Sequence, residues 1–508
     1  MSVHWPIVKS LLSSPGRVAI VDDRGEHSAG KVLGGALHIA ALIESTSGSP
    51  TGGGNPGEPR APVGVLMPTG AGFAMAALAS WILGRTVVPL NYLLKPEELQ
   101  YVIDDCGTEV VLTVGAMLDF MKFTPRVANL VRLDEQKFEG VPEARWPAMV
   151  DDDDLALLLY TSGTSGKPKG VMLTHGNIVA NVRQIVEWVG IKHGDDHVFL
   201  GVLPQFHTFG LTALTILPLS LGFKVVYLAR FMPGKIVKAL REHRPTLLIA
   251  IPSMYAALAN AKDATPEDWA SLRFVVSGGE PLPQSVFERL RDRFGVTLNE
   301  GYGLTETAPV SNWCRPQDFK RGSVGMALPG VTERIVDVNT GKPLGPNEDG
   351  EVQIMGPNVM RGYYKLPTES AGAFTSDGFF RTGDIGRFDL DGHLYITGRL
   401  KEMMIVGGEN VFPREIEEVL NRHASVAASG VIGVHDPVRG ELPVAFVEIR
   451  EGGEFDEREL QSWCRQSLAG YKVPDRVIRL DELPKNPTGK IMRRELKNRP
   501  ELKDGASA

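Results

Sequence analysis

Short apolar runs alternate with stretches of helical periodicity over the N-terminal part of the chain. The runs are rich in β-branched residues, and we predict strands at residues 17–21, 63–67, 108–114, 224–229, 246–251 and 273–277. Strands that alternate with helices form βα units, which align their strands in parallel. The pattern therefore predicts an α/β fold with a mostly parallel sheet.

The pattern changes after residue 323, where strand-like pieces with Gly-rich turns follow, for example at residues 351–355 and 393–397. A smaller mixed unit with a predicted helix at residues 415–423 comes last. We place the domain boundary before this unit, which gives an N-terminal domain of residues 1–399 and a C-terminal domain of residues 400–508. Residues 45–62 are dominated by Ser, Gly and Pro and are predicted to form a solvated insertion.

Composition places the chain among large globular enzymes. Its 508 residues exceed what one hydrophobic core usually supports, and 43% hydrophobic and 23% charged residues are ordinary for a folded protein. A net charge of −7 argues against a nucleic-acid partner. The N-terminus has no secretory signal pattern, and no apolar stretch is long enough to span a bilayer, so we expect a cytoplasmic protein for which peripheral membrane contact stays open.

The strongest local signal is the loop TSGTSGKPKG at residues 161–170. It follows an apolar run of strand length at residues 155–160 and precedes a stretch in which Ile178, Val182, Ile185 and Val189 recur at helical spacing. Glycines let backbone N–H groups face an anion, and the lysines add positive charge. The candidate phosphate-binding residues are Thr161, Ser162, Gly163, Thr164, Ser165, Gly166, Lys167 and Lys169.

This loop has two alternative interpretations. The loop differs from the G-x-x-x-x-G-K-[ST] motif of nucleotide hydrolases, because Pro168 follows Lys167 and no glycine stands five residues before Gly166. A flexible Gly/Ser surface turn is the usual interpretation of a bare Gly-rich segment. Ten consecutive residues of this composition between a predicted strand and a predicted helix favour phosphate binding.

The loop resembles the phosphate loop of the adenylate-forming superfamily, which contains acyl-CoA synthetases, peptide-synthetase adenylation domains and luciferases. Further motifs match that family in order: PQFHTFG (204–210), SGGEPL (277–282), EGYGLTE (300–306), FRTGD (380–384) with ITGRLKE (396–402), and PKNPTGK (484–490). On these motifs the chain is identified as a member of the acyl-CoA synthetase branch. The resemblance implies an AMP-binding domain of parallel sheets with a small β-barrel-like subdomain, followed by a small mobile α+β C-terminal domain.

The resemblance also implies ATP and Mg²⁺ as cofactors and a role for each motif residue. Tyr302 would stack on adenine, Asp384 would accept hydrogen bonds from the ribose with Arg399 nearby, and Thr305 would contact the α-phosphate. Glu306 would hold Mg²⁺, with Thr161 as a second metal ligand. The residues implied around the nucleotide are Gly279, Glu280, Pro281 and Gly303.

Lys490 resembles the family's mobile catalytic lysine, which reaches between the substrate carboxylate and the α-phosphate of ATP. His207 would flank the same carboxylate and the phosphates, although a lone histidine between two phenylalanines is more often a packed residue. Taken one at a time, Lys490 suits a surface lysine, Glu306 a helix-start carboxylate and Asp384 a turn residue. The set of motifs favours catalytic roles for Lys490, His207 and Glu306.

The C-terminal unit implies a second half-reaction with CoA as the acceptor. Lys401 occupies the family's hinge position, and rotation there would bring Gly407 and Gly408 to the site, where they would line a channel for the pantetheine arm. The predicted reaction is activation of a carboxylic acid by ATP to an acyl-adenylate with release of pyrophosphate, then transfer to CoA with release of AMP. A simple tight turn remains the alternative interpretation of the two glycines.

We expect a medium- or long-chain fatty acid as the substrate. PQFHTFGLT offers no aspartate for an amino-acid substrate, and Gly278 and Gly279 would leave room for an aliphatic tail beside the apolar residues 211–219. Glu280 instead resembles acetate-activating and carrier-protein-linked relatives. An acyl-carrier-protein ligase or adenylation module, an aryl-CoA ligase and a non-catalytic nucleotide-binding protein therefore stay as alternatives.

Overall fold

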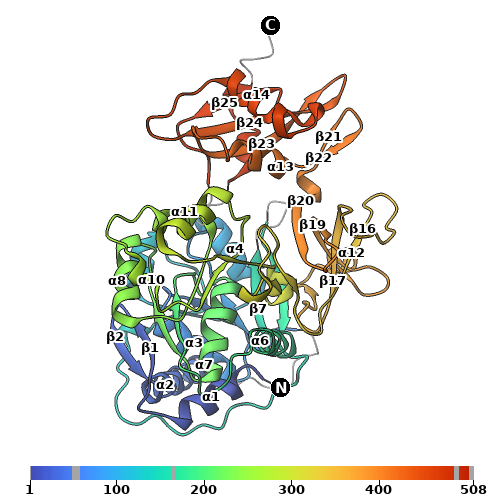
Figure 1. Ribbon diagram of the computed structural model, residues 1–508. Helices are drawn as coiled ribbons and strands as arrows, with labels where there is room; N and C mark the ends of the chain where they lie inside the picture. The colour runs from blue at the N-terminus through green and yellow to red at the C-terminus, as the bar shows by residue number, and fades with distance from the viewer. Residues whose placement is uncertain (1, 48–57, 162–166, 486–490, 503–508) are drawn as a thin grey trace.

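The computed structural model describes residues 2–47, 58–161, 167–485 and 491–502. Figure 1 shows a large body, which contains most of the chain, and a small C-terminal part that lies against one end of it. Two large sheets form the centre of the body, and a third, smaller sheet lies at its side.

The first large sheet has seven strands. Their order is β18 (Gly362–Tyr363), β8 (Lys169–Thr174), β7 (Leu155–Thr161), β4 (Val87–Pro89), β3 (Val63–Leu66), β5 (Val110–Thr113) and β6 (Asn129–Arg132). Neighbours from β7 to β6 are parallel, whereas β18, β8 and β7 pair antiparallel. β7 and β8 therefore form a hairpin near one edge of this sheet, and in the sequence they flank the predicted phosphate loop.

The second large sheet has nine strands. Their order is β15 (Met326–Ala327), β14 (Val310–Trp313), β13 (Asn299–Gly303), β12 (Phe274–Ser277), β11 (Leu247–Ala250), β9 (Val198–Gly201), β10 (Lys224–Tyr227), β1 (Val18–Asp22) and β2 (Gly25–Ser28). The strands from β13 to β1 pair in parallel. Parallel strands end at the same edge of a sheet, so the loops after β12 and β9 and the end of β13 lie near one another.

Helices cover these sheets. The helices of the body are α1 (His4–Ser13), α2 (Ala29–Ser47), α3 (Ala71–Ile82), α4 (Pro96–Cys106), α5 (Gly115–Met121), α6 (His175–Val189), α7 (Leu217–Leu221), α8 (Pro233–His243), α9 (Pro252–Ala259), α10 (Pro266–Trp269), α11 (Gln284–Phe294) and α12 (Pro367–Ala373). A π-helical segment, Phe209–Ile216, precedes α7. None of the described helices is long and apolar enough to cross a membrane.

The smaller sheets lie late in the chain. The antiparallel sheet of the body contains β16 (Thr332–Val336), β17 (Gly350–Met355), β19 (Phe380–Phe388) and β20 (Leu394–Arg399). The C-terminal part contains β21 (Met404–Val406), β22 (Glu409–Val411), β23 (Val426–Asp436), β24 (Gly440–Ile449), β25 (Arg476–Leu480), α13 (Pro413–Leu420), α14 (Glu457–Ser467) and α15 (Arg493–Leu496). Buried side chains up to Phe380 and those from Met404 onward form separate clusters, so the C-terminal part has a core of its own.

The observed strands match the predicted α/β pattern, and the fold class is confirmed. One local prediction is wrong: the phosphate loop is followed by the strand β8, and α6 starts only at His175. Residues 169–174 form a strand because they pair with β7, which buries Val171 and Leu173. Thr174 then caps α6, since its hydroxyl accepts a hydrogen bond from the Asn177 N–H at 3.1 Å, an arrangement typically worth about 1 kcal/mol.

Candidate active site

The β7–β8 hairpin carries both ends of the predicted phosphate loop. Thr161 lies opposite Lys169 in the ladder. The Lys167 ammonium lies 5.2 Å from the ring centroid of Tyr101, and the Lys169 ammonium lies 5.4 Å from that of Tyr363. Both lysines therefore lie at the end of the hairpin where the predicted loop joins β7 to β8. The loop residues predicted to bind phosphate between them, Ser162, Gly163, Thr164, Ser165 and Gly166, lie outside the described residues, as does Lys490.

The residues predicted for adenine and ribose come together from distant parts of the chain. The Tyr302 hydroxyl donates to Asp384 Oδ2 at 2.7 Å, and Arg399 Nε lies 2.8 Å from Asp384 Oδ1. Asp384 on β19 stands opposite Arg399 on β20, so the ladder itself sets this ion pair. Burial and the adjacent carboxylate raise the pKa of Tyr302 well above its usual value, and the charge of Asp384 raises the pKa of Arg399.

Glu306, the predicted metal ligand, is half-buried beside this cluster. Its Oε1 accepts a hydrogen bond from the Tyr363 hydroxyl at 3.0 Å, and no other described side chain donates to it. Burial raises the pKa of Glu306, although its own backbone N–H, the Tyr363 hydroxyl and the charge of Arg399 oppose the shift. A carboxylate with one oxygen fixed and the other without a side-chain donor fits a hard cation, which prefers oxygen ligands.

The backbone around Glu306 depends on a glycine. A Cβ on Gly303 would lie 1.8 Å from the carbonyl oxygen of Pro309, so only glycine allows this close approach. The next residues then turn back, because the Leu304 N–H donates to that same carbonyl at 3.0 Å. Thr305 begins the short 3₁₀ helix Thr305–Thr307, which places Thr305 and Glu306 directly after the strand that carries Tyr302.

The segment with Gly279, Glu280 and Pro281 follows β12. Ser277 at the end of β12 stands opposite Glu300 of β13, so this segment lies beside the strand that leads to Tyr302. Gly279 has a φ of +82°, a left-handed conformation that favours glycine. These three residues therefore lie near Tyr302 at one edge of the sheet, and their role around the nucleotide stays a prediction.

Arg321 contacts two segments at the same edge of the sheet. The sequence did not predict a role for it. Its guanidinium forms an ion pair with Glu300 of β13 and donates to the carbonyl oxygen of Leu282 at 2.9 Å. It thereby joins β13 to the loop after β12. No motif predicts this link, because the partners come together only in the folded sheet.

His207 follows β9 in the loop before the π-helical segment. Its ring packs against Phe206 with centroids 4.6 Å apart, and its buried Nε2 has no hydrogen-bond partner among the described residues. Burial lowers the pKa of His207 to about 4, so the ring is neutral near pH 7. A neutral ring nitrogen without a partner in an apolar wall is available to a polar ligand group.

The expectation of open room at Gly278 is wrong. The ring of Phe209 lies 3.1 Å from the position that a Cβ on Gly278 would take, and the carbonyl oxygen of Gly301 lies 3.3 Å from it. The glycine is needed here for close packing against an aromatic ring. The apolar wall next to the end of β12 is therefore aromatic on this side.

The predicted hinge residue Lys401 lies in the 3₁₀ turn Leu400–Glu402, between β20 of the body and β21 of the C-terminal part. Gly407 and Gly408 form the two-residue turn of the β21–β22 hairpin, with φ values of 62° and 90°, and both are exposed. Such a turn needs positive φ at both positions, which explains the two glycines. A role for them in a CoA channel stays a prediction.

A half-buried ion network joins the 3₁₀ turn Leu400–Glu402 to α15. Arg493 on α15 lies 2.9 Å from Glu402 of this turn and 2.7 Å from Glu417 of α13. The sequence did not predict this network, because its members are spread over more than ninety residues and share no motif.

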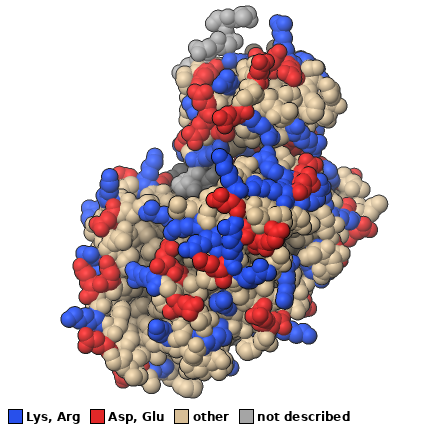
Figure 2. All heavy atoms as spheres, turned by 60° about the vertical axis from the view of Figure 1, so that its left-hand side comes forward, with Lys and Arg blue, Asp and Glu red and all other residues tan. Residues whose placement is uncertain are grey.

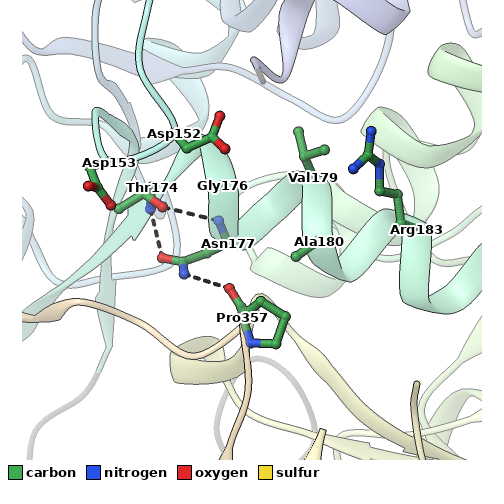
Figure 3. Close-up of a pocket in the computed structure, with 9 residues that line it drawn as sticks. All are labelled: Asp152, Asp153, Thr174, Gly176, Asn177, Val179, Ala180, Arg183 and Pro357. Carbon is green, nitrogen blue, oxygen red and sulfur yellow. Dashed lines mark hydrogen bonds between the residues drawn. The ribbon is translucent and has the colours of Figure 1, made fainter. Parts of the chain in front are cut away.

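A separate cavity of about 270 Å³ lies at the start of α6 (Figure 3). The hydrogen-bond donors and acceptors at this helix start are used within the protein, because Thr174 and Asn177 bond each other and Asn177 Nδ2 donates to the Pro357 carbonyl oxygen at 2.8 Å. Its lining residues are Asp152, Asp153, Thr174, Gly176, Asn177, Val179, Ala180, Arg183 and Pro357. None of them is a predicted site residue, so we assign the candidate active site to the Tyr302, Asp384 and Glu306 cluster.

Comparison with known proteins shows which family this chain resembles. Residues 13–364 match the AMP-binding enzyme family, and residues 415–490 match the AMP-binding enzyme C-terminal domain. A long-chain-fatty-acid–CoA ligase of Bacillus subtilis (strain 168) is 34% identical over 478 residues, which cover 85% of this chain and 84% of that protein. A feruloyl-CoA synthase of an Amycolatopsis species is 36% identical over 428 residues, covering 82% of this chain and 84% of that protein.

The solved structures agree. ATP-bound MatB from Rhodopseudomonas palustris superposes with a TM-score of 0.86 at 30% identity, over 98% of this chain and 99% of that one. The shared fold, the matched family and the CoA ligases among the relatives lead to one conclusion. The chain belongs to the AMP-binding enzyme family of adenylate-forming enzymes, and it is an AMP-forming acid–thiol ligase of the acyl- and aryl-CoA ligase group.

Proposed function

We propose that this enzyme joins an apolar carboxylic acid to CoA at the expense of ATP, in two steps at one site. The observation that carries the proposal is the cluster in which Tyr302 and Arg399 both bond Asp384, with the charges of Asp384 and Arg399 acting on Glu306 nearby. A nucleoside fits such a cluster, because its ribose hydroxyls can donate to a fixed carboxylate while its base lies against an aromatic ring.

In the first step, a carboxylate oxygen of the acid attacks the α-phosphorus of ATP. A new P–O bond forms, the bond to the bridging oxygen of the β-phosphate breaks, and pyrophosphate leaves. Lys490 stabilises the negative charge that accumulates between the two reactants, and the hairpin lysines Lys167 and Lys169 hold the departing phosphates. Mg²⁺, held by Glu306 with Thr161, supplies positive charge to the phosphates when bound.

In the second step, the CoA thiol releases its proton to solvent water, and its sulfur attacks the acyl carbonyl carbon. A thioester forms and AMP leaves. We propose that a domain boundary between residues 399 and 400 separates the two moving parts, that the turn around Lys401 is the hinge, and that Gly407 and Gly408 line the pantetheine channel after rotation. The separate hydrophobic core of the C-terminal part supports this division.

Charge on the surface suits the polyanionic substrates. Figure 2 shows Lys and Arg side chains gathered where the small C-terminal part meets the body, although the chain as a whole has a net charge of −7. A local basic surface of this kind raises the concentration of ATP and CoA near the site. We retain a cytoplasmic location as part of the proposal.

A medium- or long-chain fatty acid is the first candidate substrate, and the long-chain-fatty-acid–CoA ligase among the relatives supports it. An aryl acid is the second candidate. Phe209 packs against Gly278, and Phe206 lies in a T-shaped contact with Tyr92 at 4.8 Å, so the wall near His207 is largely aromatic. Flat rings stack well on such walls, and the feruloyl-CoA synthase among the relatives supports this alternative.

A panel of acids distinguishes these candidates. Acetate, octanoate, palmitate and 4-coumarate would each be assayed with ATP, Mg²⁺ and free CoA, and kcat/KM would be compared. The first candidate predicts that octanoate or palmitate is preferred. A preference for 4-coumarate would establish the aryl alternative, and a preference for acetate would refute both. Adenylate formation without transfer to free CoA would instead indicate an acyl carrier protein as the acceptor.

A further inference from the structure

Tyr363 lies where two parts of the candidate site meet. It ends the two-residue strand β18, in which Tyr363 pairs with Val171 of β8, the strand that returns from the phosphate loop. Its backbone N–H donates to Ser370 Oγ of α12 at 2.8 Å. The residue is therefore held by backbone contacts on both sides, and its side chain projects from a fixed position.

The side chain of Tyr363 contacts two groups with separate predicted roles. Its hydroxyl donates to Glu306 Oε1 at 3.0 Å, and the Lys169 ammonium lies over its ring at 5.4 Å from the centroid. Glu306 and Lys169 are 137 residues apart in the sequence, and this one aromatic side chain touches both. A Tyr side chain suits this double contact, since its ring attracts a cation and its hydroxyl donates to a carboxylate.

We propose that Tyr363 is a positioning residue for the adenylation reaction. Its side chain orients the Glu306 carboxylate toward the metal and holds Lys169 beside the polyphosphate. This inference rests on the proposed function, in which Glu306 holds Mg²⁺. The terminal torsion of a glutamate is broad, so a free carboxylate samples many orientations. A hydrogen bond to Oε1 selects one of them and leaves the lone pairs of Oε2 for the cation.

The Tyr363 hydroxyl contributes a hydrogen bond to Glu306 in addition to the packing of its ring. A phenylalanine at this position would keep the ring under Lys169 and the backbone pairing with β8. It would remove only the donor to Glu306. Partners that orient a metal ligand commonly change metal affinity by about 10–100-fold when they are removed.

The test is Mn²⁺ binding, measured by electron paramagnetic resonance with Mn²⁺ in place of Mg²⁺ and a non-hydrolysable ATP analogue present. Tyr363→Phe is expected to weaken Mn²⁺ binding by about 10-fold, with little change in the affinity for the metal-free nucleotide. Tyr364→Phe is the matched control, because the neighbouring Tyr364 hydroxyl bonds no described residue, and it should bind Mn²⁺ like the wild type.

A double-mutant cycle with Glu306→Gln separates a positioning role from a general loss of structure. If Tyr363 acts through Glu306, adding Tyr363→Phe to Glu306→Gln weakens Mn²⁺ binding no further. Equal effects of Tyr363→Phe in both backgrounds would overturn the inference. Wild-type Mn²⁺ binding by Tyr363→Phe would also overturn it.

The same cycle tells a failure of the inference from a failure of the proposed function. If Glu306→Gln weakens Mn²⁺ binding and Tyr363→Phe does not, Glu306 still holds the metal and only the role of Tyr363 is wrong. If Glu306→Gln itself binds Mn²⁺ like the wild type, the proposed metal site is wrong, and the inference fails with it.

Discussion

The hydroxyl of Tyr302 lies 2.7 Å from the carboxylate of Asp384, although 82 residues separate them in the chain. The first residue comes from the nine-stranded sheet and the second from the small antiparallel sheet, so this hydrogen bond joins two sheets at the candidate nucleotide site. Arg399 completes the unit from the next strand. The two sheets therefore have to dock correctly before a nucleoside can bind.

Replacement of Asp384 tests this unit. Asp384→Asn keeps the size of the side chain but removes the charge that pairs with Arg399 and would accept the ribose hydroxyls. Hydrogen bonds to charged groups contribute about 1.5–3 kcal/mol, so we expect AMP binding, measured by calorimetry, to weaken by about 10–100-fold. The free energy of unfolding should also fall, because the variant loses the ion pair with Arg399. The loss should be only about 1–2 kcal/mol, since Arg399 is partly exposed and its charge is partly screened.

Asp391→Asn is the matched control for this experiment. Asp391 also forms an ion pair, with Lys320, but its side chain is 73% exposed and lies outside the cluster. Its replacement should leave AMP affinity unchanged. Comparable losses of affinity in both variants would contradict the role of Asp384.

The sequence predicted the fold class and most strands because buried parallel strands are short, continuous apolar runs bounded by turns. It missed β8, since residues 169–174 follow a Gly-rich loop and resemble the start of the next helix. The strand exists because it pairs with β7 on one side and with β18, nearly 200 residues later, on the other. Local propensity cannot reveal such a distant partner.

In the candidate site, too, residues in short motifs were predicted, and residues that act through distant contacts were not. Tyr302, Glu306 and Asp384 lie in short motifs, and the structure brings them together. Tyr363 and Arg321 were missed, because their importance comes from contacts with residues far away in the chain. The opposite error occurred at Gly278, where a glycine suggested open space and the ring of Phe209 fills it. A glycine in a sequence does not tell what occupies the space beside it.

Lys490→Ala tests the proposed catalytic lysine, which lies outside the described residues. Loss of one transition-state donor typically costs about 10²–10³-fold, so adenylate formation should slow by at least that factor. The transfer of a presynthesised acyl-adenylate to CoA should be nearly unaffected, because the proposed role of Lys490 is confined to the first step. Rapid-quench measurement of both half-reactions checks this difference.

Lys485→Ala serves as the control within the same motif. The Lys485 ammonium lies 2.9 Å from Glu448 in an ion pair on the surface of the C-terminal part. Its removal should leave both half-reactions near wild-type rates. Equal slowing of both half-reactions in Lys490→Ala would show that the lysine is not specific to adenylation.

Lys401→Pro tests the proposed hinge. Proline fixes φ and restricts the residue before it, so the 3₁₀ turn Leu400–Glu402 would lose its freedom to rotate. Adenylate formation should remain, whereas thioester formation should slow by on the order of 100-fold if rotation is required. Lys401→Ala removes the side chain but keeps the rotation, and it should transfer the acyl group normally. Thioester formation as fast as adenylate formation in Lys401→Pro would refute domain alternation.

Two buried histidines predict that the protein loses stability in mild acid. Burial lowers the pKa of His4 to about 4 and that of His175 to about 3, and their rings lie 5.9 Å apart between α1 and α6. In the unfolded chain both take up a proton near pH 6.5, so below that pH the unfolded state binds more protons than the folded state. The free energy of unfolding should therefore fall as the pH drops from 6.5 toward 4.5, by up to about 2–3 kcal/mol per histidine.

Chemical denaturation across this pH range checks the effect. The variant with both His4→Gln and His175→Gln should show a shallower pH dependence, whereas His193→Gln, at an exposed position, should match the wild type. An unchanged slope in the double variant would assign the acid sensitivity to other groups.

We propose that one site forms an acyl-adenylate and passes the acyl group to CoA. The most direct measurement is the exchange of labelled pyrophosphate into ATP with and without octanoate, followed by mass spectrometry of the products after CoA is added. We expect exchange that depends on the acid, and the appearance of octanoyl-CoA and AMP in equal amounts. Binding of ATP without exchange, for every acid in the panel, would contradict it.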